Sequence, residues 1–227
     1  MIADIIRHGK VPGNLRGSYV GCRTDESLSP VGREELEKTR SLYRPPDFLY
    51  LSPMKRCIET ALIIYPDAMH NGAYKIVDDL RECDFGRFEG RSCQDMENDP
   101  EYCRWVEDGG MSRFPGGESP DEFITRSCLA FRTFLEHELM SEMRSASGRD
   151  RGLSQERRIA WVVHGGTIMS ILQEAGWPRK PFYEWHCENG EGFELFFSPE
   201  SYSGMKRAKG AVRYPAGERT QTGEKLI

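Results

Sequence analysis

The sequence has no long hydrophobic run, because no apolar stretch among its 227 residues approaches the roughly 20 residues that span a bilayer. Its start has no basic segment followed by a long apolar one, so we expect no secretory signal. The seven cysteines, from Cys22 to Cys187, include no Cys-x-x-Cys pair. This spacing suits neither a zinc site nor a disulfide framework. We therefore expect reduced thiols and a cytoplasmic location.

An excess of positive charge is missing as well. The 31 lysines and arginines are outnumbered by 36 aspartates and glutamates, and the formal net charge is -5. No overall basic field exists to attract nucleic acid, so any basic pocket must be local. We therefore expect neither a membrane nor nucleic acid as a partner. The number of chains that associate stays open, with a homodimer as one option.

What the sequence does contain is an alternation of strand-like and helix-like segments. Short apolar runs typical of strands occupy residues 3–6, 48–51, 74–77, 159–163 and 193–197. Capped or periodic segments typical of helices occupy residues 30–42, 54–65, 120–139 and 167–175. The alternation predicts an α/β fold, a three-layer α/β/α sandwich with a mostly parallel central sheet and helices on both faces.

A chain of this length is sufficient for a single domain with a sizeable core. We assign residues 1–198 to that domain. Residues 199–227 turn to glycine, lysine, arginine and polar side chains, which predicts a basic and loosely ordered tail. Residues 141–157 are rich in serine, glycine and arginine, which predicts a mobile loop.

Two of the expected strands end in histidine followed by glycine. The first strand runs into His8 and Gly9, and a later one runs into His164 and Gly165. Ligands of open α/β sheets bind at the carboxyl ends of the strands, and glycine lets the backbone approach a ligand closely. If the two strands are neighbours in a parallel sheet, His8 and His164 meet at its carboxyl edge.

Charged residues near other strand ends could complete a phosphate site. Arg7 stands beside the first histidine, and Arg56 lies in the first turn of the helix after the second strand. Arginine forks and helix N-termini both suit phosphate oxygens. An acid beside a bound phosphate would have a raised pKa, which suits a general acid. Glu82, Asp84 and Glu89 all lie in a suitable segment, and the residues alone do not choose among them.

Five short motifs follow one another along the chain. They are Arg7-His8-Gly9, Ser-Pro-x-x-Arg-x-x-x-Thr from Ser52 to Thr60, Leu-x-Glu ending at Glu82, Pro-Gly-Gly-Glu-Ser from Pro115 to Ser119, and Val-Val-His-Gly-Gly from Val162 to Gly166. This set resembles the histidine phosphatase superfamily, the phosphoglycerate mutase-like group, in its cofactor-independent phosphatase branch. The resemblance covers residues 2–175. Each motif is weak singly, but five in the right order are specific.

The resemblance implies a reaction through a phosphohistidine, with no metal and no cofactor. His8 would attack phosphorus, and Glu82 would protonate the leaving group and then activate water. Arg7, Arg56 and His164 would bind the phosphoryl oxygens. Further phosphate contacts would come from Asn14, Gly165, Gly9 and Gly21. Since His8 must attack through an unprotonated ring nitrogen, its other N–H should be held by an acceptor.

The function implied is hydrolysis of a small phosphorylated metabolite by a phosphomonoesterase. Residues 10–14 and 19–21 are similar to α-ribazole phosphatases of cobalamin assembly and to general sugar phosphatases. The first alternative is a phosphoglycerate mutase, which needs a basic lid that excludes water; residues 107–113 contain no Arg-Arg segment. The second alternative is a non-enzymatic phosphate-binding module on the same fold.

Overall fold

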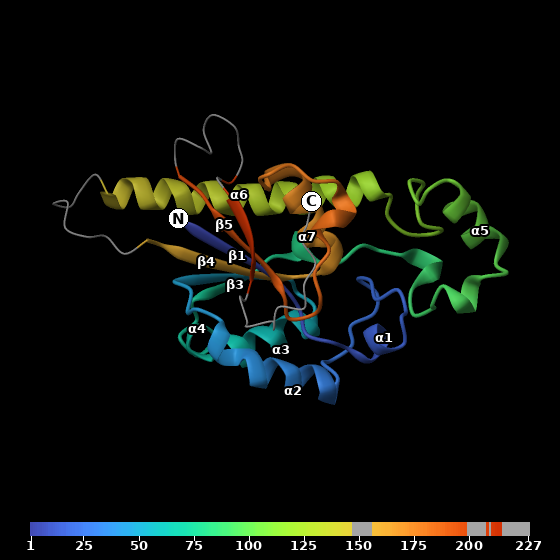
Figure 1. Cartoon of the computed structure of the whole chain (residues 1–227), viewed down its shortest axis with the longest axis horizontal. Helices are drawn as coiled ribbons and strands as arrows, with labels where there is room; N and C mark the ends of the chain where they lie inside the picture. The colour runs from blue at the N-terminus through green and yellow to red at the C-terminus, as the bar shows by residue number, and fades with distance from the viewer. Residues whose placement is uncertain (147–155, 199–207, 209, 215–227) are drawn as a thin grey trace, which may run out of the picture.

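The computed structural model describes residues 1–146, 156–198, 208 and 210–214, and it has a central sheet between two layers of helices (Figure 1). The strands are β1 (Ile2–Arg7), β2 (Phe48–Leu51), β3 (Tyr74–Ile76), β4 (Arg158–Val163), β5 (Gly192–Phe196) and β6 (Gly210–Tyr214). The α-helices are α1 (Pro12–Leu15), α2 (Pro30–Thr39), α3 (Lys55–Ile64), α4 (Pro66–His70), α5 (Pro100–Glu107), α6 (Pro120–Ala146) and α7 (Gly165–Ala175). Short 3₁₀ turns are η1 (Arg40–Leu42), η2 (Asp78–Leu80), η3 (Gly86–Phe88), η4 (Gln94–Met96) and η5 (Phe182–Trp185).

The sheet has the strand order β3-β2-β4-β1-β5-β6. β3, β2, β4 and β1 are parallel to one another, whereas β5 and β6 are antiparallel to their neighbours. The predicted α/β fold with a mostly parallel sheet is therefore confirmed. Arg7 of β1 lies opposite Val163 of β4. Because the two strands end at the same level, the residues that follow them, His8 and His164, leave the sheet side by side.

Both faces of the sheet are covered by helices, as the sequence predicted. α6 and α7 pack on one face, where Leu135 and Ile168 join a cluster of buried side chains. α2 and α3 pack on the other face, where Leu36 and Ala61 belong to a second cluster. β1 and β4 lie between the two layers and are buried almost throughout. Central parallel strands covered on both faces have such continuous apolar runs.

A third apolar cluster is formed mainly by the chain that connects η2 to α6. This connection includes α5, which lies at the end of the molecule away from the strands (Figure 1). Its buried members include Phe88, Met96 and Phe114, and the rings of Tyr102 and Trp105 pack against Phe88. Aromatic rings bury much apolar area and prefer edge-to-face contacts. This cluster anchors the chain that follows Glu82 separately from the sheet.

Two segments differ from the sequence-based expectation. Residues 141–146, expected in a loop, continue α6. They include glutamate, methionine and arginine, which have a high intrinsic helix propensity. Residues 210–214, expected in the loosely ordered tail, form β6 and pair with β5. An edge strand such as β5 would otherwise expose unpaired backbone groups. Residues 147–155 of the expected loop and most of the expected tail lie outside the described residues.

Within the described ranges, no helix combines the length and the apolar character that a membrane crossing requires.

Candidate active site

The ends of β1 and β4 bring the two predicted histidines into contact. The ring centroids of His8 and His164 are 5.2 Å apart, with an interplanar angle of 65°. Both side chains are buried. The amide of His8 donates to the carbonyl of Val163 over 3.0 Å, which extends the sheet pairing by one residue. The parallel register thus places the two rings edge to face at the carboxyl end of the sheet.

His8 has a fixed tautomer. Its Nδ1 lies 2.7 Å from the carbonyl oxygen of Gly9, and a carbonyl can only accept, so Nδ1 carries the proton and Nε2 the lone pair. The acceptor that a nucleophilic His8 requires is therefore in place. Burial lowers the pKa of His8 well below its usual value, and the positive charges of Arg56 and Arg7 lower it further. His8 is thus neutral at physiological pH and free to react through Nε2.

His164 is held at both ring nitrogens. The Nε of Arg56 donates to Nδ1 over 3.2 Å, and the Oγ of Ser52 lies 2.7 Å from Nε2. Burial lowers the pKa of His164 well below its usual value, and the positive charge of Arg56 lowers this pKa further. The ring is neutral, and because Nδ1 accepts, its proton lies on Nε2 and is donated to Ser52.

Arg56 is fully buried in the first turns of α3. Besides His164, its guanidinium donates to the carbonyl oxygens of Thr24 over 2.6 Å and Gly21 over 3.1 Å. Neither Arg56 nor Arg7 forms an ion pair with a carboxylate within the described ranges. A buried guanidinium held only by neutral groups retains its full charge for an anionic ligand.

Arg7 leaves part of its guanidinium unused. Its Nη1 donates to the carbonyl of Cys187 over 2.7 Å and lies 3.5 Å from Nε2 of His186. Its Nε is buried and has no hydrogen-bond partner. A Cβ on Gly165 would lie 3.3 Å from both Nε and Cζ of Arg7. The absence of a side chain at Gly165 thus lets the guanidinium lie against the start of α7.

The N-terminus of α7 adds further donors. His164 is the N-cap residue but its side chain makes no capping bond. The amides of the first helical turn have no partner within a helix, and they attract anions together with the helix dipole. The amide of Gly165, which we predicted to contact phosphate, belongs to this turn.

Glu82 lies beside that same turn. Its Oε1 accepts from the amide of Cys83 over 3.0 Å, and its Oε2 accepts from the amide of Gly166 over 3.4 Å. A Cβ on Gly166 would stand 2.8 Å from Oε1, so a side chain there would displace this carboxyl. Burial raises the pKa of Glu82 above its usual value, although these amides and the arginines act in the opposite direction. Glu82 can therefore hold a proton at a higher pH than an exposed carboxyl.

The other predicted phosphate contacts have internal partners. The amide of Gly9 donates to Oγ1 of Thr60 over 3.0 Å, and the carbonyl of Gly21 binds Arg56 as described above. The Oδ1 of Asn14 accepts from the amide of Val11 over 3.1 Å and lies 3.3 Å from Nδ2 of Asn189. These residues shape the walls of the site, and a direct contact with phosphate stays a prediction for each.

Three supporting residues were missed in the sequence. Ser52 holds His164, Thr60 holds Gly9, and the side-chain amide of Asn189 donates to the carbonyl of His8 over 3.0 Å. Ser52 and Thr60 stand inside the Ser-Pro-x-x-Arg-x-x-x-Thr motif, so the motif itself marked them. Asn189 precedes Gly190, whose φ of 79° marks a turn, but nothing in the sequence relates that turn to His8.

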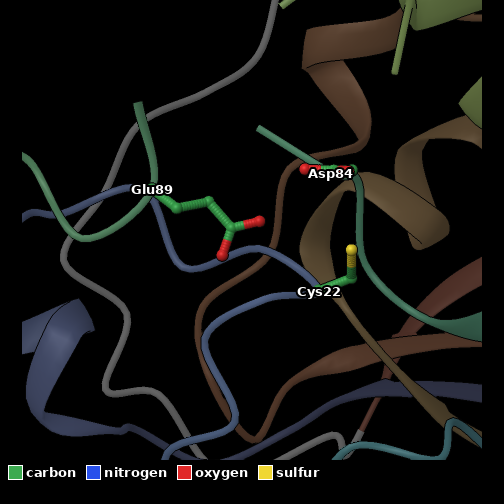
Figure 2. A group of neighbouring side chains, drawn as sticks. All are labelled: Cys22, Asp84 and Glu89. Carbon is green, nitrogen blue, oxygen red and sulfur yellow. The ribbon is translucent and has the colours of Figure 1, made fainter. Parts of the chain in front are cut away.

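One cluster near the site has the composition of a metal site. Figure 2 shows the side chains of Cys22, Asp84 and Glu89 turned toward a common space, and their ligand atoms lie within 4.8 Å of one another. Both carboxylates already have partners: Arg23 binds Asp84, and the hydroxyl of Thr24 donates to Glu89 over 2.7 Å. Burial raises the pKa of the Cys22 thiol. The cluster therefore fits a brace between two loops better than a cation site.

The charges suit a phosphate dianion. Arg7 and Arg56 contribute two positive charges, and His8 and His164 are neutral. Glu82 is the buried acid, and it is neutral when it holds its proton. A ring nitrogen with a free lone pair therefore lies near two guanidinium groups without a carboxylate partner and near the start of a helix, an arrangement that can stabilise charge developing on a phosphoryl group.

Comparisons with known proteins show the family and the fold. A protein of Hydrogenobacter thermophilus provisionally named phosphoserine phosphatase 2 is 30% identical over 173 residues, which cover 74% of this chain and 75% of the relative. Among solved structures, the α-ribazole phosphatase from Shigella flexneri has a TM-score of 0.64 at 21% identity, covering 88% of this chain and 92% of that one. A phosphoglycerate mutase from Thermus thermophilus has a TM-score of 0.58 at 21% identity, covering 86% and 92%.

The fold of these solved structures is shared, as the TM-scores show. The family model of the histidine phosphatase superfamily (branch 1) matches residues 4–206. This range includes all five residues predicted to be catalytic, which are Arg7, His8, Arg56, Glu82 and His164. The chain therefore belongs to the histidine phosphatase superfamily and is a phosphatase that acts on phosphate esters.

Proposed function

We propose that the protein is a metal-independent phosphomonoesterase that acts through a phosphohistidine on His8. The observation that carries this proposal is the bond from Nδ1 of His8 to the carbonyl of Gly9, which leaves Nε2 with its lone pair beside two arginines without carboxylate partners. A buried neutral imidazole in such a place is suited to nucleophilic attack. A phosphate-binding module would need the arginines but not this tautomer.

In the first step, Nε2 of His8 forms a bond to phosphorus as the ester oxygen leaves. The protonated carboxyl of Glu82 gives its proton to that oxygen, so the product is an alcohol. Arg7, Arg56, His164 and the first turn of α7 stabilise the charge on the phosphoryl oxygens. The raised pKa of Glu82 favours the protonated form that this step requires.

In the second step, the ionised Glu82 takes a proton from water. The hydroxide formed attacks phosphorus, the bond from phosphorus to Nε2 breaks, and the lone pair returns to His8. Inorganic phosphate leaves, and Glu82 is again protonated. Two displacements in one pocket replace a single difficult attack by water.

The substrate is a small phosphorylated metabolite of the α-ribazole phosphate or sugar phosphate type. Similarity to a relative provisionally named a phosphoserine phosphatase adds phosphoserine to the compounds worth testing. A cytoplasmic location and a homodimer stay predictions from the sequence.

The test is an assay with p-nitrophenyl phosphate in excess chelator, combined with trapping of an acid-labile phosphoenzyme and a panel of metabolite phosphates. We expect phosphate release in chelator and a phosphoenzyme that resists base. No phosphate release from any compound of the panel, together with no phosphoenzyme, would support the phosphate-binding module. Conversion of 3-phosphoglycerate to its isomer without net phosphate release would establish the mutase instead.

A further inference from the structure

Ser52 is a buried residue with no role in the two proposed reaction steps. It follows β2, is fully buried, and places its Oγ 2.7 Å from Nε2 of His164. The other neighbour of this nitrogen is Sγ of Cys57 at 3.6 Å. Burial raises the pKa of the Cys57 thiol to about 12, so it is neutral and a weak partner. The hydroxyl of Ser52 is thus the principal hydrogen-bond partner of Nε2.

The opposite side of the ring determines the direction of that bond. Nε of Arg56 can only donate, and it lies 3.2 Å from Nδ1 of His164. Nδ1 therefore has the lone pair in the free site, and Nε2 donates its proton to Ser52. The ring has no proton left to offer to an anion.

A bound phosphoryl group must change this arrangement. Its oxygens accept the N–H of Arg56, and Nδ1 of His164 then loses its donor. A bare nitrogen lone pair beside an oxyanion is repulsive, whereas a protonated Nδ1 would donate a charge-assisted hydrogen bond. Because Nε2 stays bound to Ser52, the ring can supply that bond only by gaining a second proton.

We propose that Ser52 is a positioning residue that holds His164 by Nε2, so that binding of a tetrahedral dianion is coupled to uptake of a single proton at Nδ1. The proton comes from solvent. The resulting imidazolium donates from Nε2 to Ser52 and from Nδ1 to the anion. The inference rests on the proposed function, because it requires the phosphoryl group to bind between Arg56 and His164.

The groups around His164 explain why the ring gains a second proton only when the anion is bound. The charged and titratable groups that face the ring are Arg56 and Cys57 from α3, Arg7 and His8 from β1, Arg126 from α6, and Glu82 at the first turn of α7. After burial, the positive charges are the largest opponents of protonation. A dianion placed among them offsets that repulsion.

Sulfate is a suitable probe because it is a tetrahedral dianion that does not titrate near neutral pH. Calorimetric titration of the full-length protein in two buffers with different ionisation enthalpies measures the protons taken up. The pKa of Glu82 also rises beside a bound anion, so the proton at His164 is measured as a difference between two proteins. The unaltered protein should take up about one proton more per sulfate bound than the variant His164→Gln, which should also bind sulfate more weakly. Equal uptake by the two proteins would overturn the proposal.

Nitrogen-15 NMR of the histidine-labelled protein reads the ring directly. The chain has five histidines, and the His164→Gln variant assigns the signals of His164. We expect a proton on Nε2 alone in the free protein, and protons on both nitrogens at saturating sulfate. A proton on Nδ1 in the free protein, or a bare Nδ1 with sulfate bound, would contradict the coupling.

Ser52→Ala tests the serine, and Ser127→Ala is its matched control. Both remove a buried hydroxyl, but Oγ of Ser127 has no hydrogen-bond partner. Losing the acceptor of the imidazolium should move the alkaline limb of sulfate affinity to lower pH by about one unit. Ser127→Ala should leave that limb in place. An unshifted limb in Ser52→Ala, or an equal shift in the control, would argue against the positioning role.

The two proposals can fail separately. If Ser52→Ala does not fold, calorimetry and NMR of the unaltered protein and of His164→Gln still decide the coupling, since neither measurement depends on turnover. A protein that takes up the proton with sulfate but never forms a phosphoenzyme would refute the proposed function alone. A protein that forms the phosphoenzyme without the proton uptake would refute only the role of Ser52.

Discussion

The two histidine–glycine turns are alike in sequence and opposite in their hydrogen bonds. His8 donates to the carbonyl of its own neighbour, Gly9, and keeps Nε2 free. His164 is bound at both ring nitrogens, by Ser52 and by Arg56. The same dipeptide at the same level of one sheet therefore leaves a ring nitrogen with a free lone pair in one place, as the proposed nucleophile requires, and a ring held at both nitrogens in the other. The difference comes from what α3 and the loop after β2 place against the second turn.

The glycines of the two turns differ as well. A Cβ on Gly9 would lie 2.6 Å from Cδ1 of Leu36 and 3.1 Å from Cδ2 of Leu28, which are core residues. A Cβ on Gly165 would instead meet the guanidinium of Arg7 at 3.3 Å. The first glycine allows core packing behind the proposed nucleophile, and the second leaves room for Arg7, which we propose binds the substrate.

Replacement of each histidine by alanine should give the largest difference in kcat/KM between the two turns. His8→Ala removes the only nitrogen placed for attack, and we expect kcat/KM to fall by at least about 10⁴-fold with no phosphoenzyme. His164→Ala removes one stabilising group, and we expect a loss of roughly 10²- to 10³-fold with a phosphoenzyme still detectable. Rapid quenching in base detects the phosphoenzyme, and steady-state kinetics measure the change in kcat/KM. Full hydrolysis by His8→Ala would show that the proposed mechanism is wrong.

The turn that contains His164 also holds Glu82, whose carboxylate accepts from the amide of Gly166. Glu82→Gln should slow hydrolysis of an alkyl phosphate by roughly 10²- to 10³-fold, because an alkoxide needs a proton to leave. Release of p-nitrophenolate in the first step needs little protonation, so trapping of the phosphoenzyme from p-nitrophenyl phosphate should be much less affected.

The pH dependence of kcat/KM has a definite sign in this scheme. Since burial raises the pKa of Glu82, its acid form persists above the usual range and is lost as pH rises through the raised value. With an alkyl phosphate, kcat/KM should fall along that limb. In Glu82→Gln the part of this fall that depends on the carboxyl should disappear, because glutamine does not titrate, and only the limb from the proton taken up by His164 should remain. An unchanged pH profile in the variant would assign the whole fall to another group.

The two glycines should give the smallest and most selective effects. Gly9→Ala forces a methyl group against buried leucines and should lower the free energy of unfolding by about 1–3 kcal/mol. Gly165→Ala should leave stability nearly unchanged but displace Arg7, lowering kcat/KM by about tenfold. Thermal melting and kinetics on both variants separate the effects. Equal melting temperatures for the two variants would remove the distinction between the turns.

Much of the fold could be predicted because its signals are local. Pro30 and Pro120 mark helix starts, and the apolar run that precedes His164 marks a strand buried on both faces. The end of α6 and the strand β6 could not be predicted in this way. Residues 141–146 contain no stop signal, and Gly210–Tyr214 is a strand only because β5 offers an edge to pair with.

The sequence by itself determined the α/β fold class and the order of the motifs that place the chain among the histidine phosphatases. Both depend on residue types at short spacings. Only the tertiary structure decided which ring nitrogen is free and which is held. Ser52 and His164 are 112 positions apart, and Arg7 reaches a carbonyl 180 positions away. A tautomer depends on such distant donors and acceptors, and no local pattern encodes them.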